Sequence, residues 1–292
     1  MNDFLQSFIF DNHPVRGVIV RLNQTTHTIF EKHAYPKTIQ SLLAEALIAN
    51  VCLFSIAKEN GKMTLQFQSQ DPAPIKFLSA HCTFDRKLRA FAEWNSNLPE
   101  EIEPHSTPLP LPLSDLLGPN ACLILTYQSE GLLQPFQSII PVLPEQRSIS
   151  QAVESYFTNS DQIKTYLHII SDGQKAAGFM LQALPDATLD STIAQEESFT
   201  HLATLAKTVT PNELFTDSPE ELLFKLFHQE KARIFEPRPL AFGCTCTKEK
   251  MENAVRSLGP KEIEKILEEK SYIEVNCQFC NQKYQWTPDE TK

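Results

Sequence analysis

Two cysteine motifs, Cys244-Thr245-Cys246 and Cys277-Gln278-Phe279-Cys280, decide how the C-terminal part of this 292-residue chain can fold. Thirty residues separate them. Four thiolates supplied by two such pairs match the tetrahedral coordination of a closed zinc site. A closed site holds no bound water, so zinc-dependent hydrolysis is disfavoured. The spacing therefore predicts one zinc ion per chain, held by Cys244, Cys246, Cys277 and Cys280.

The cysteines lie within a small unit, residues 240–292, whose sequence pattern predicts two helices and a hairpin. One helix is expected over residues 249–257 and another from Pro260 onward. Residues 272–275 and 283–286 predict two strands, with the second cysteine motif between them. A unit of this size has too little core to be stable without a staple. Loss of the ion is therefore expected to unfold it.

The preceding segment, residues 186–239, is acidic and carries helix start signals. It holds ten acidic and five basic side chains. Thr210 and Ser218 are each followed by proline and then by glutamate at the third position, which is the capping-box signature. Isolated helices of this length are marginal in water, so their apolar faces must dock on another surface. An ordinary helical subdomain and a metastable linker both fit this pattern.

Residues 1–185 predict an α+β core domain with an antiparallel sheet. Residues 36–58 carry apolar side chains at helical spacing and predict one long buried helix. Runs of strands with few helices between them favour antiparallel pairing. Residues 98–118 contain five prolines and predict a surface loop without an assigned function. Strands are expected at 15–22, 63–68, 75–83, 88–94, 122–127, 165–170 and 176–184.

Composition narrows the compartment and the class of function. The acidic start lacks the features of a signal peptide, and no run of about 18 apolar residues predicts a membrane span, so a cytoplasmic protein is expected. In a reducing compartment, seven cysteines favour metal or redox chemistry over structural disulfides. The net charge of −10 argues against nucleic-acid binding. With eight glycines and no phosphate-binding loop, ATP-driven action is not expected, and no catalytic motif predicts an enzyme.

The other three cysteines have less distinctive surroundings. Cys52 and Cys122 lie in apolar stretches and are expected to be small core residues. Cys82 follows His81, which makes a weak candidate for a metal-binding or nucleophilic pair without a third partner.

Two interpretations of the four-cysteine site remain open on spacing alone. One is a plain zinc ribbon that only staples the C-terminal fold. The other is a redox switch, because zinc holds cysteine sulfur as the nucleophilic thiolate and oxidation of one pair removes two of the four ligands. The unusual Cys-x-Cys half and the adjacent acidic segment favour the switch.

Several blocks along the chain carry a family resemblance. They include His33-Ala34-Tyr35-Pro36, Phe235-Glu236-Pro237-Arg238-Pro239 and Glu252-Asn253-Ala254-Val255-Arg256-Ser257-Leu258-Gly259, together with both cysteine motifs. In these blocks the chain resembles the 33 kDa chaperonins, the redox-regulated heat-shock chaperones of bacteria. The resemblance runs from end to end.

The resemblance implies a mechanism that spacing does not give. The reduced, zinc-bound form would be inactive, and oxidative stress would form the disulfides Cys244–Cys246 and Cys277–Cys280, one of three possible pairings. The zinc-binding redox-switch domain (240–292) and the metastable linker (186–239) would then unfold. The core domain (1–185) would serve client binding and dimerisation. The resemblance thus implies an ATP-independent holdase that binds unfolding proteins, prevents their aggregation and forms a homodimer when activated.

Two other functions compete with this one. A zinc-ribbon adaptor could bind a partner protein or nucleic acid without redox control, but residues from 241 onward carry eight basic and nine acidic side chains, which disfavours nucleic acid. A thiol–disulfide oxidoreductase could use Cys277 and Cys280. Its motif would belong at a strand-to-helix junction, whereas this motif is expected between two strands.

Overall fold

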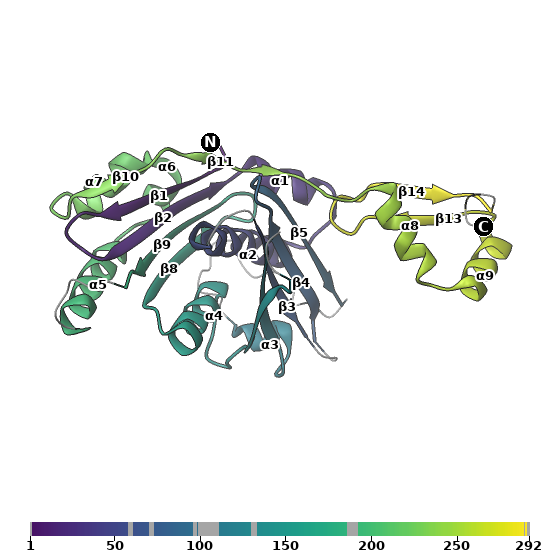
Figure 1. Ribbon diagram of the computed structural model, residues 1–292, viewed down its shortest axis with the longest axis horizontal. Coiled ribbons are helices and arrows are strands. Elements are labelled where there is room, and N and C mark those ends of the chain that lie inside the picture. Colours follow the sequence, from purple (N-terminus) through teal and green to yellow (C-terminus); the bar gives the residue numbers. More distant parts are fainter. Residues whose placement is uncertain are drawn as a thin grey trace.

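The protein consists of a two-sheet body, a layer of helices outside one sheet, and a C-terminal unit that extends away from the body (Figure 1). The computed structural model describes residues 2–57, 61–69, 73–95, 98, 111–129, 133–185, 192–288 and 290. It confirms the predicted α+β class, although the body contains two six-stranded sheets where the sequence predicted one antiparallel sheet.

The long helix α2 (Lys37–Ile56) lies between the two sheets. The expected helix over residues 36–58 is therefore confirmed. By length and composition α2 could cross a membrane, but 78% of its apolar window is buried inside the protein. Leu43, Leu47 and Val51 are fully buried in the larger core cluster. This apolar helix is the centre of the core.

The first sheet has the strand order β10-β1-β2-β9-β8, and β11 also pairs with β1. All of its pairings are antiparallel. Its strands are β1 (Phe4–Phe10), β2 (Val15–Leu22), β8 (Thr165–Ser171), β9 (Ala176–Ala183), β10 (Ala232–Ile234) and β11 (Arg238–Pro239).

The second sheet has the order β12-β5-β4-β3-β6-β7. Its pairings are antiparallel except for the parallel pair of β12 with β5. Its strands are β3 (Gly61–Gln68), β4 (Ile75–Cys82), β5 (Lys87–Trp94), β6 (Cys122–Ser129), β7 (Phe136–Pro141) and β12 (Ala241–Phe242).

The body also contains short helices that the sequence did not predict: α1 (Gln24–Glu31), α3 (Leu113–Leu117), α4 (Ile149–Tyr156) and the π-helical turn η1 (Phe157–Asp161). Of the proline-rich segment expected to be a loop, residues 99–110 lie outside the described residues. Residues 113–117 of that segment form α3.

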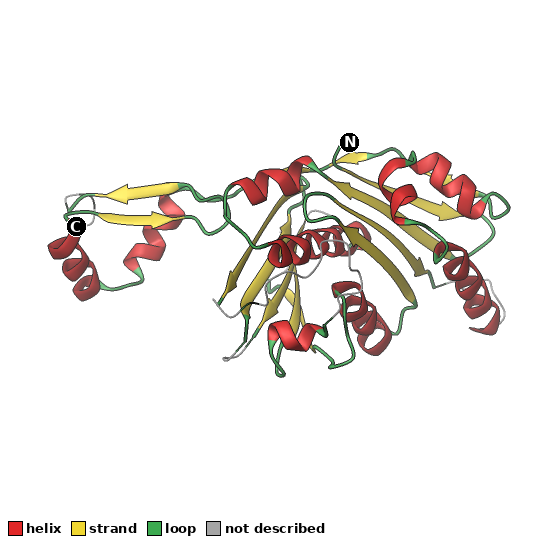
Figure 2. Cartoon of the chain, turned by 180° about the vertical axis from the view of Figure 1, so that it is seen from behind, coloured by secondary structure: helices red, strands yellow, loops and turns green. Residues whose placement is uncertain are grey.

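Three helices, α5 (Thr192–Ala206), α6 (Pro211–Thr216) and α7 (Pro219–Phe227), cover the outer face of the first sheet (Figures 1 and 2). Both predicted capping boxes are present. The apolar helix faces share a core cluster with Phe8, Ile19 and Phe179 of the sheet. The helices therefore dock on the sheet as expected.

The end of the acidic segment differs from the prediction because it forms β10 and β11. Backbone pairing with β1 joins these strands to the body, and β12 then pairs with the second sheet. The chain leaves the body only after Phe242. Short edge strands of this kind are specified by the neighbouring strand rather than by their own sequence.

The C-terminal unit contains α8 (Lys248–Arg256), α9 (Pro260–Lys270), β13 (Ile273–Asn276) and β14 (Lys283–Trp286), close to the predicted positions. Strands β13 and β14 form the expected hairpin. Among its described residues, this unit has a core of three buried apolar side chains, Val255, Ile273 and Trp286, with six partly buried ones packed against them. Such a small core gives little stability by itself.

Candidate metal centre

The two cysteine motifs meet where the C-terminal unit joins the body. The four sulfur atoms of Cys244, Cys246, Cys277 and Cys280 lie within 4.8 Å of one another. The Sγ–Sγ distance is 3.7 Å between Cys244 and Cys277 and 3.4 Å between Cys246 and Cys280. All seven cysteines of the chain are free thiols. The expected cluster is thus assembled.

The first motif follows directly from β12. Gly243 donates its backbone N–H to the Leu88 carbonyl at 3.0 Å. A Cβ at this position would lie 2.7 Å from the Lys87 side chain, so glycine permits the close approach. After Cys246, the Thr247 hydroxyl caps α8 by accepting from the Lys250 amide. A strand and a helix cap therefore fix the first motif from both sides.

The second motif forms the turn between β13 and β14. The Cys277 amide donates to the Gln282 carbonyl at 2.9 Å, and the Asn281 amide donates to the Cys277 carbonyl at 2.8 Å. Asn281 has φ 56°, a left-handed conformation that asparagine tolerates. This turn directs both sulfurs toward the first motif.

The sulfur positions fit a tetrathiolate metal site. A regular tetrahedron with zinc–sulfur bonds of about 2.3 Å has sulfur–sulfur edges of about 3.8 Å. The two distances above, 3.7 and 3.4 Å, lie at and slightly below that value. Four thiolate ligands suit zinc or iron–sulfur chemistry and disfavour magnesium and calcium, which prefer oxygen ligands.

The thiols influence one another's ionisation. Burial opposes ionisation of Cys244, but hydrogen bonds from the Cys246 backbone and from neighbouring thiols lower its pKa to about 7. Burial and then hydrogen bonds with the neighbouring thiols raise the pKa of Cys280. A bound cation would supply the positive charge that allows several thiols to ionise together.

Donors from outside the motifs also reach the cluster. Tyr284 Oη donates to Cys246 Sγ at 3.2 Å, and the Arg89 guanidinium lies 3.8 Å from Cys244 Sγ. Arg89 also donates to Thr245 Oγ1 at 2.8 Å. Hydrogen bonds of this kind orient metal ligands and stabilise thiolate charge. Tyr284 lies on the adjacent strand, whereas Arg89 is distant in sequence and gave no local signal.

Phe279, inside the second motif, rests on the second sheet of the body. The Arg89 guanidinium lies 4.2 Å from the centre of its ring. The rings of His81 and Phe91 approach it edge-on at 4.9 and 5.4 Å. The cysteine turn is therefore held against β4 and β5 as well as against the first motif.

The remaining cysteines are separate from the cluster. Cys52 and Cys82 are buried, and burial raises the pKa of both. His81 and Cys82 are successive strand residues and therefore point to opposite faces, so they form no joint site. The expectation of a core position is wrong for Cys122, which is only half-buried.

Comparison with known proteins gives the relationship. The family model described as Hsp33 protein matches residues 3–287. The chain belongs to the Hsp33 family. The 33 kDa chaperonins of Nitrosococcus oceani and Neisseria gonorrhoeae are both 36% identical to it, over 97% of this chain and 90% and 88% of theirs. These Hsp33-family names identify the chain as a chaperone and confirm the resemblance stated above.

A solved structure supports the same conclusion. The crystal structure of the 33 kDa chaperonin (heat shock protein 33 homolog) from Thermotoga maritima is similar, with a TM-score of 0.77 and 25% identity. The similarity covers 99% of this chain and 96% of that one. The Hsp33 fold therefore extends over the body, helices α5–α7 and the cysteine unit.

Proposed function

We propose that this Hsp33-family chain is an ATP-independent holdase that is switched on by oxidation of its four-cysteine centre. In the reduced state, Cys244, Cys246, Cys277 and Cys280 hold one zinc ion and the chaperone is inactive. In the oxidised state, disulfides Cys244–Cys246 and Cys277–Cys280 replace the metal site. The chain then binds unfolding proteins and prevents their aggregation.

The observation that carries the proposal is the dependence of a very small core on the cysteine cluster. Among its described residues, three buried apolar side chains and six partly buried ones stabilise the C-terminal unit, and four sulfurs within 4.8 Å join its two halves. Structural zinc contributes roughly 10–16 kcal/mol of apparent binding free energy in small modules. That exceeds the net stability of a domain of this size. Loss of the thiolates therefore amounts to loss of the fold.

The oxidation step uses a peroxide as the oxidant. A cysteine thiolate attacks one peroxide oxygen and becomes a sulfenic acid, and hydroxide leaves. The second thiolate of the pair attacks the sulfenic sulfur, so a disulfide forms and a second hydroxide leaves. Each pair loses two electrons to one peroxide molecule. A site that retains two of its four thiolates no longer holds the ion.

The client surface follows from what the linker covers. Helices α5–α7 lie over a face of the first sheet that includes Phe8, Phe10 and Phe179. An apolar surface of this kind, once uncovered, suits exposed apolar segments of unfolding proteins. We assign client binding and dimerisation of the activated form to the core domain 1–185. The linker 186–239 would uncover the apolar sheet face, and the zinc-binding domain 240–292 would sense the oxidant.

The wider proposal is a cytoplasmic, non-enzymatic chaperone that uses neither ATP nor nucleic acid. A reducing compartment keeps the thiols available for metal binding until stress occurs. The net charge of −10 disfavours contacts with phosphate backbones.

The test compares reduced, zinc-loaded protein with protein treated with peroxide at mildly raised temperature. We expect only the treated form to suppress light scattering by a thermally unfolding client. A chromogenic chelator should detect about one zinc per chain on oxidation, matching four cysteines per tetrahedral site. Peptide mapping reads the disulfide pairing. Equal suppression by both forms would refute the switch, and salt-dependent binding of RNA or DNA by the reduced form would favour an adaptor.

A further inference from the structure

Arg21 lies on the sheet face that the linker helices cover. Successive strand residues alternate between faces, so Val15, Gly17, Ile19 and Arg21 of β2 share one face. Val15 and Ile19 belong to the core cluster beneath the linker. Arg21 as a whole residue is 5% exposed. A permanent positive charge is therefore buried between the sheet and α6.

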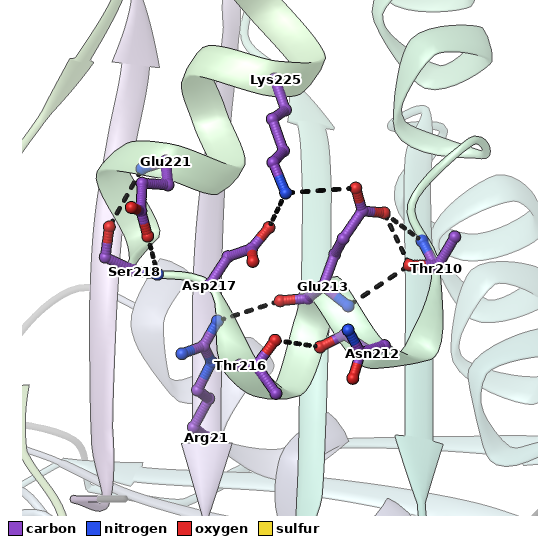
Figure 3. Close-up of polar contacts among 9 residues, drawn as sticks. All are labelled: Arg21, Thr210, Asn212, Glu213, Thr216, Asp217, Ser218, Glu221 and Lys225. Carbon is purple, nitrogen blue, oxygen red and sulfur yellow. Dashed lines mark hydrogen bonds and ion pairs between the residues drawn. The ribbon is translucent and has the colours of Figure 1, made fainter.

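The guanidinium has few partners there. Figure 3 shows the side chain directed from the sheet toward the turn between α6 and α7. Its Nη2 donates to the Glu213 carbonyl at 3.5 Å, and among the described residues its Nε has no hydrogen-bond partner. The Phe4 ring centre lies 5.7 Å away. Within the part of the chain that the structure describes, no carboxylate oxygen comes within 4.0 Å of Arg21.

The nearest opposing charge already has another partner. Asp217, at the end of α6, accepts from Lys225 Nζ at 2.7 Å. Burial lowers the pKa of Arg21, and the attraction of Asp217, which raises it, only partly offsets that effect. The neighbouring charges therefore compensate incompletely for the water that this guanidinium has lost.

We propose that Arg21 weakens the docking of α6 and α7, so that the linker is released readily once the cysteine centre is lost. Burying a charge without full hydrogen bonding is unfavourable, and replacing it by an apolar side chain of similar size often stabilises a fold. When the helices leave, water hydrates Arg21 completely. The burial of Arg21 thus favours the state in which α6 and α7 have left the sheet.

The effect of Arg21 on docking is distinct from the stability of the helices themselves. The capping boxes at Thr210 and Ser218 stabilise α6 and α7 as helices. Arg21 acts on the contact between those helices and the sheet. Helices α6 and α7 are accordingly stable as helices but are weakly docked on the sheet at Arg21.

Hydrogen–deuterium exchange of the reduced, zinc-loaded full chain tests the proposal. Arg21→Met removes the charge and keeps an unbranched side chain. We expect the amides of α6 and α7 to exchange about tenfold more slowly, equivalent to about 1.4 kcal/mol. Arg21→Lys retains a charge and should not slow exchange. Faster or unchanged exchange in Arg21→Met would overturn the proposal, and faster exchange would identify Arg21 as a clamp.

Arg16→Met is the matched control. Arg16 lies on the same strand but on the opposite face, where its guanidinium donates to Gln182 Oε1 at 2.6 Å. This variant should leave exchange in α6 and α7 unchanged. Should Arg21→Met fold poorly, Arg21→Gln removes the same charge with a smaller polar group. Its hydrogen exchange in α6 and α7 is then compared with wild type by the same criterion.

A second measurement rests on the proposed function. After equal peroxide treatment, Arg21→Met should gain aggregation suppression several-fold more slowly than wild type. Gain at the wild-type rate would contradict a role for Arg21 in release. If the wild type itself shows no redox-dependent suppression, the proposed function fails, and the exchange experiment still decides the role of Arg21.

Discussion

The guanidinium of Arg89 on β5 lies 4.2 Å from the ring centre of Phe279 in the second cysteine motif. This contact joins the sheet of the body to the turn that carries two of the four sulfurs. Cation–π contacts contribute about 0.5–1 kcal/mol at exposed sites and more when desolvated. We therefore expect the state of the cysteine centre to affect the docking of the C-terminal unit.

Phe279→Ala should loosen that docking without removing a metal ligand. Loss of the ring removes its contacts with Arg89, His81 and Phe91. We expect peroxide to oxidise the cysteines several-fold faster while the reduced protein still binds zinc. Thiol titration over time measures the rate. Phe84→Ala, at an exposed phenylalanine outside the contact, is the control, and equal rates in the two variants would contradict the coupling.

Cys246→Ser should abolish tight metal binding. The change removes one sulfur of the cluster and the acceptor of the Tyr284 hydrogen bond. Zinc content is expected to fall well below one ion per chain, and α8, α9 and the hairpin should lose protection from hydrogen exchange. Cys122→Ser, at a half-buried cysteine outside the cluster, should keep full zinc content. Normal zinc content in Cys246→Ser would exclude a four-sulfur site.

Thr210→Ala and Ser218→Ala should loosen the linker by removing the two helix caps. Each lost cap costs about 1 kcal/mol of helix stability. We expect faster hydrogen exchange in α6 and α7 and activation at a lower temperature under the same oxidant. Thr204→Ala changes an exposed threonine whose hydroxyl donates to the Thr200 carbonyl within α5. If the cap variants behave like this control, the linker helices do not limit release.

Glu154 should make stability depend on pH. Burial raises its pKa to about 7, although the Leu167 amide and Lys207 lower it. The carboxyl also faces a cleft lined by Tyr166 and His168. A raised folded-state pKa means that the folded protein binds more protons than the unfolded chain. This contribution to stability is therefore present below about pH 4.5 and is lost as the pH rises to about 7.

Urea unfolding at pH 5 and pH 8 measures this dependence. Glu154→Gln keeps an oxygen that can accept from the Leu167 amide, which now donates to Glu154 Oε1 at 2.6 Å. The variant should be more stable than wild type at pH 8 and should show a smaller difference between the two pH values. An unchanged difference would assign the pH dependence to other groups.

Local signals predicted much of this structure. The capping boxes gave α6 and α7, and apolar periodicity gave α2 and most body strands. Helix α1 was missed because its cap is not local. Asp3, about twenty residues upstream, accepts hydrogen bonds from the backbone amides of Asn23, Gln24 and Thr25.

The residues of the candidate site likewise divide into those with a local sequence signal and those without one. Cysteine spacing identified the four sulfur positions, because close pairs are the usual source of tetrahedral ligands. The partners Arg89 and His81 come from strands that reach the site only through tertiary packing. Nothing in the sequence around Arg89 marks it as a neighbour of Cys244.

The pairing of β10 and β11 with β1 determines whether the unfolded helical segment would be a closed loop or a free tail. Residues 184–231 begin where β9 ends and finish where β10 starts, and both strands belong to one sheet. Melting α5–α7 while these strands stay paired produces a closed loop rather than a free tail. Holding the two ends of the loop together costs an entropy that grows only with the logarithm of the loop length. The segment would remain tethered above the surface it uncovers, as an intramolecular competitor for every client.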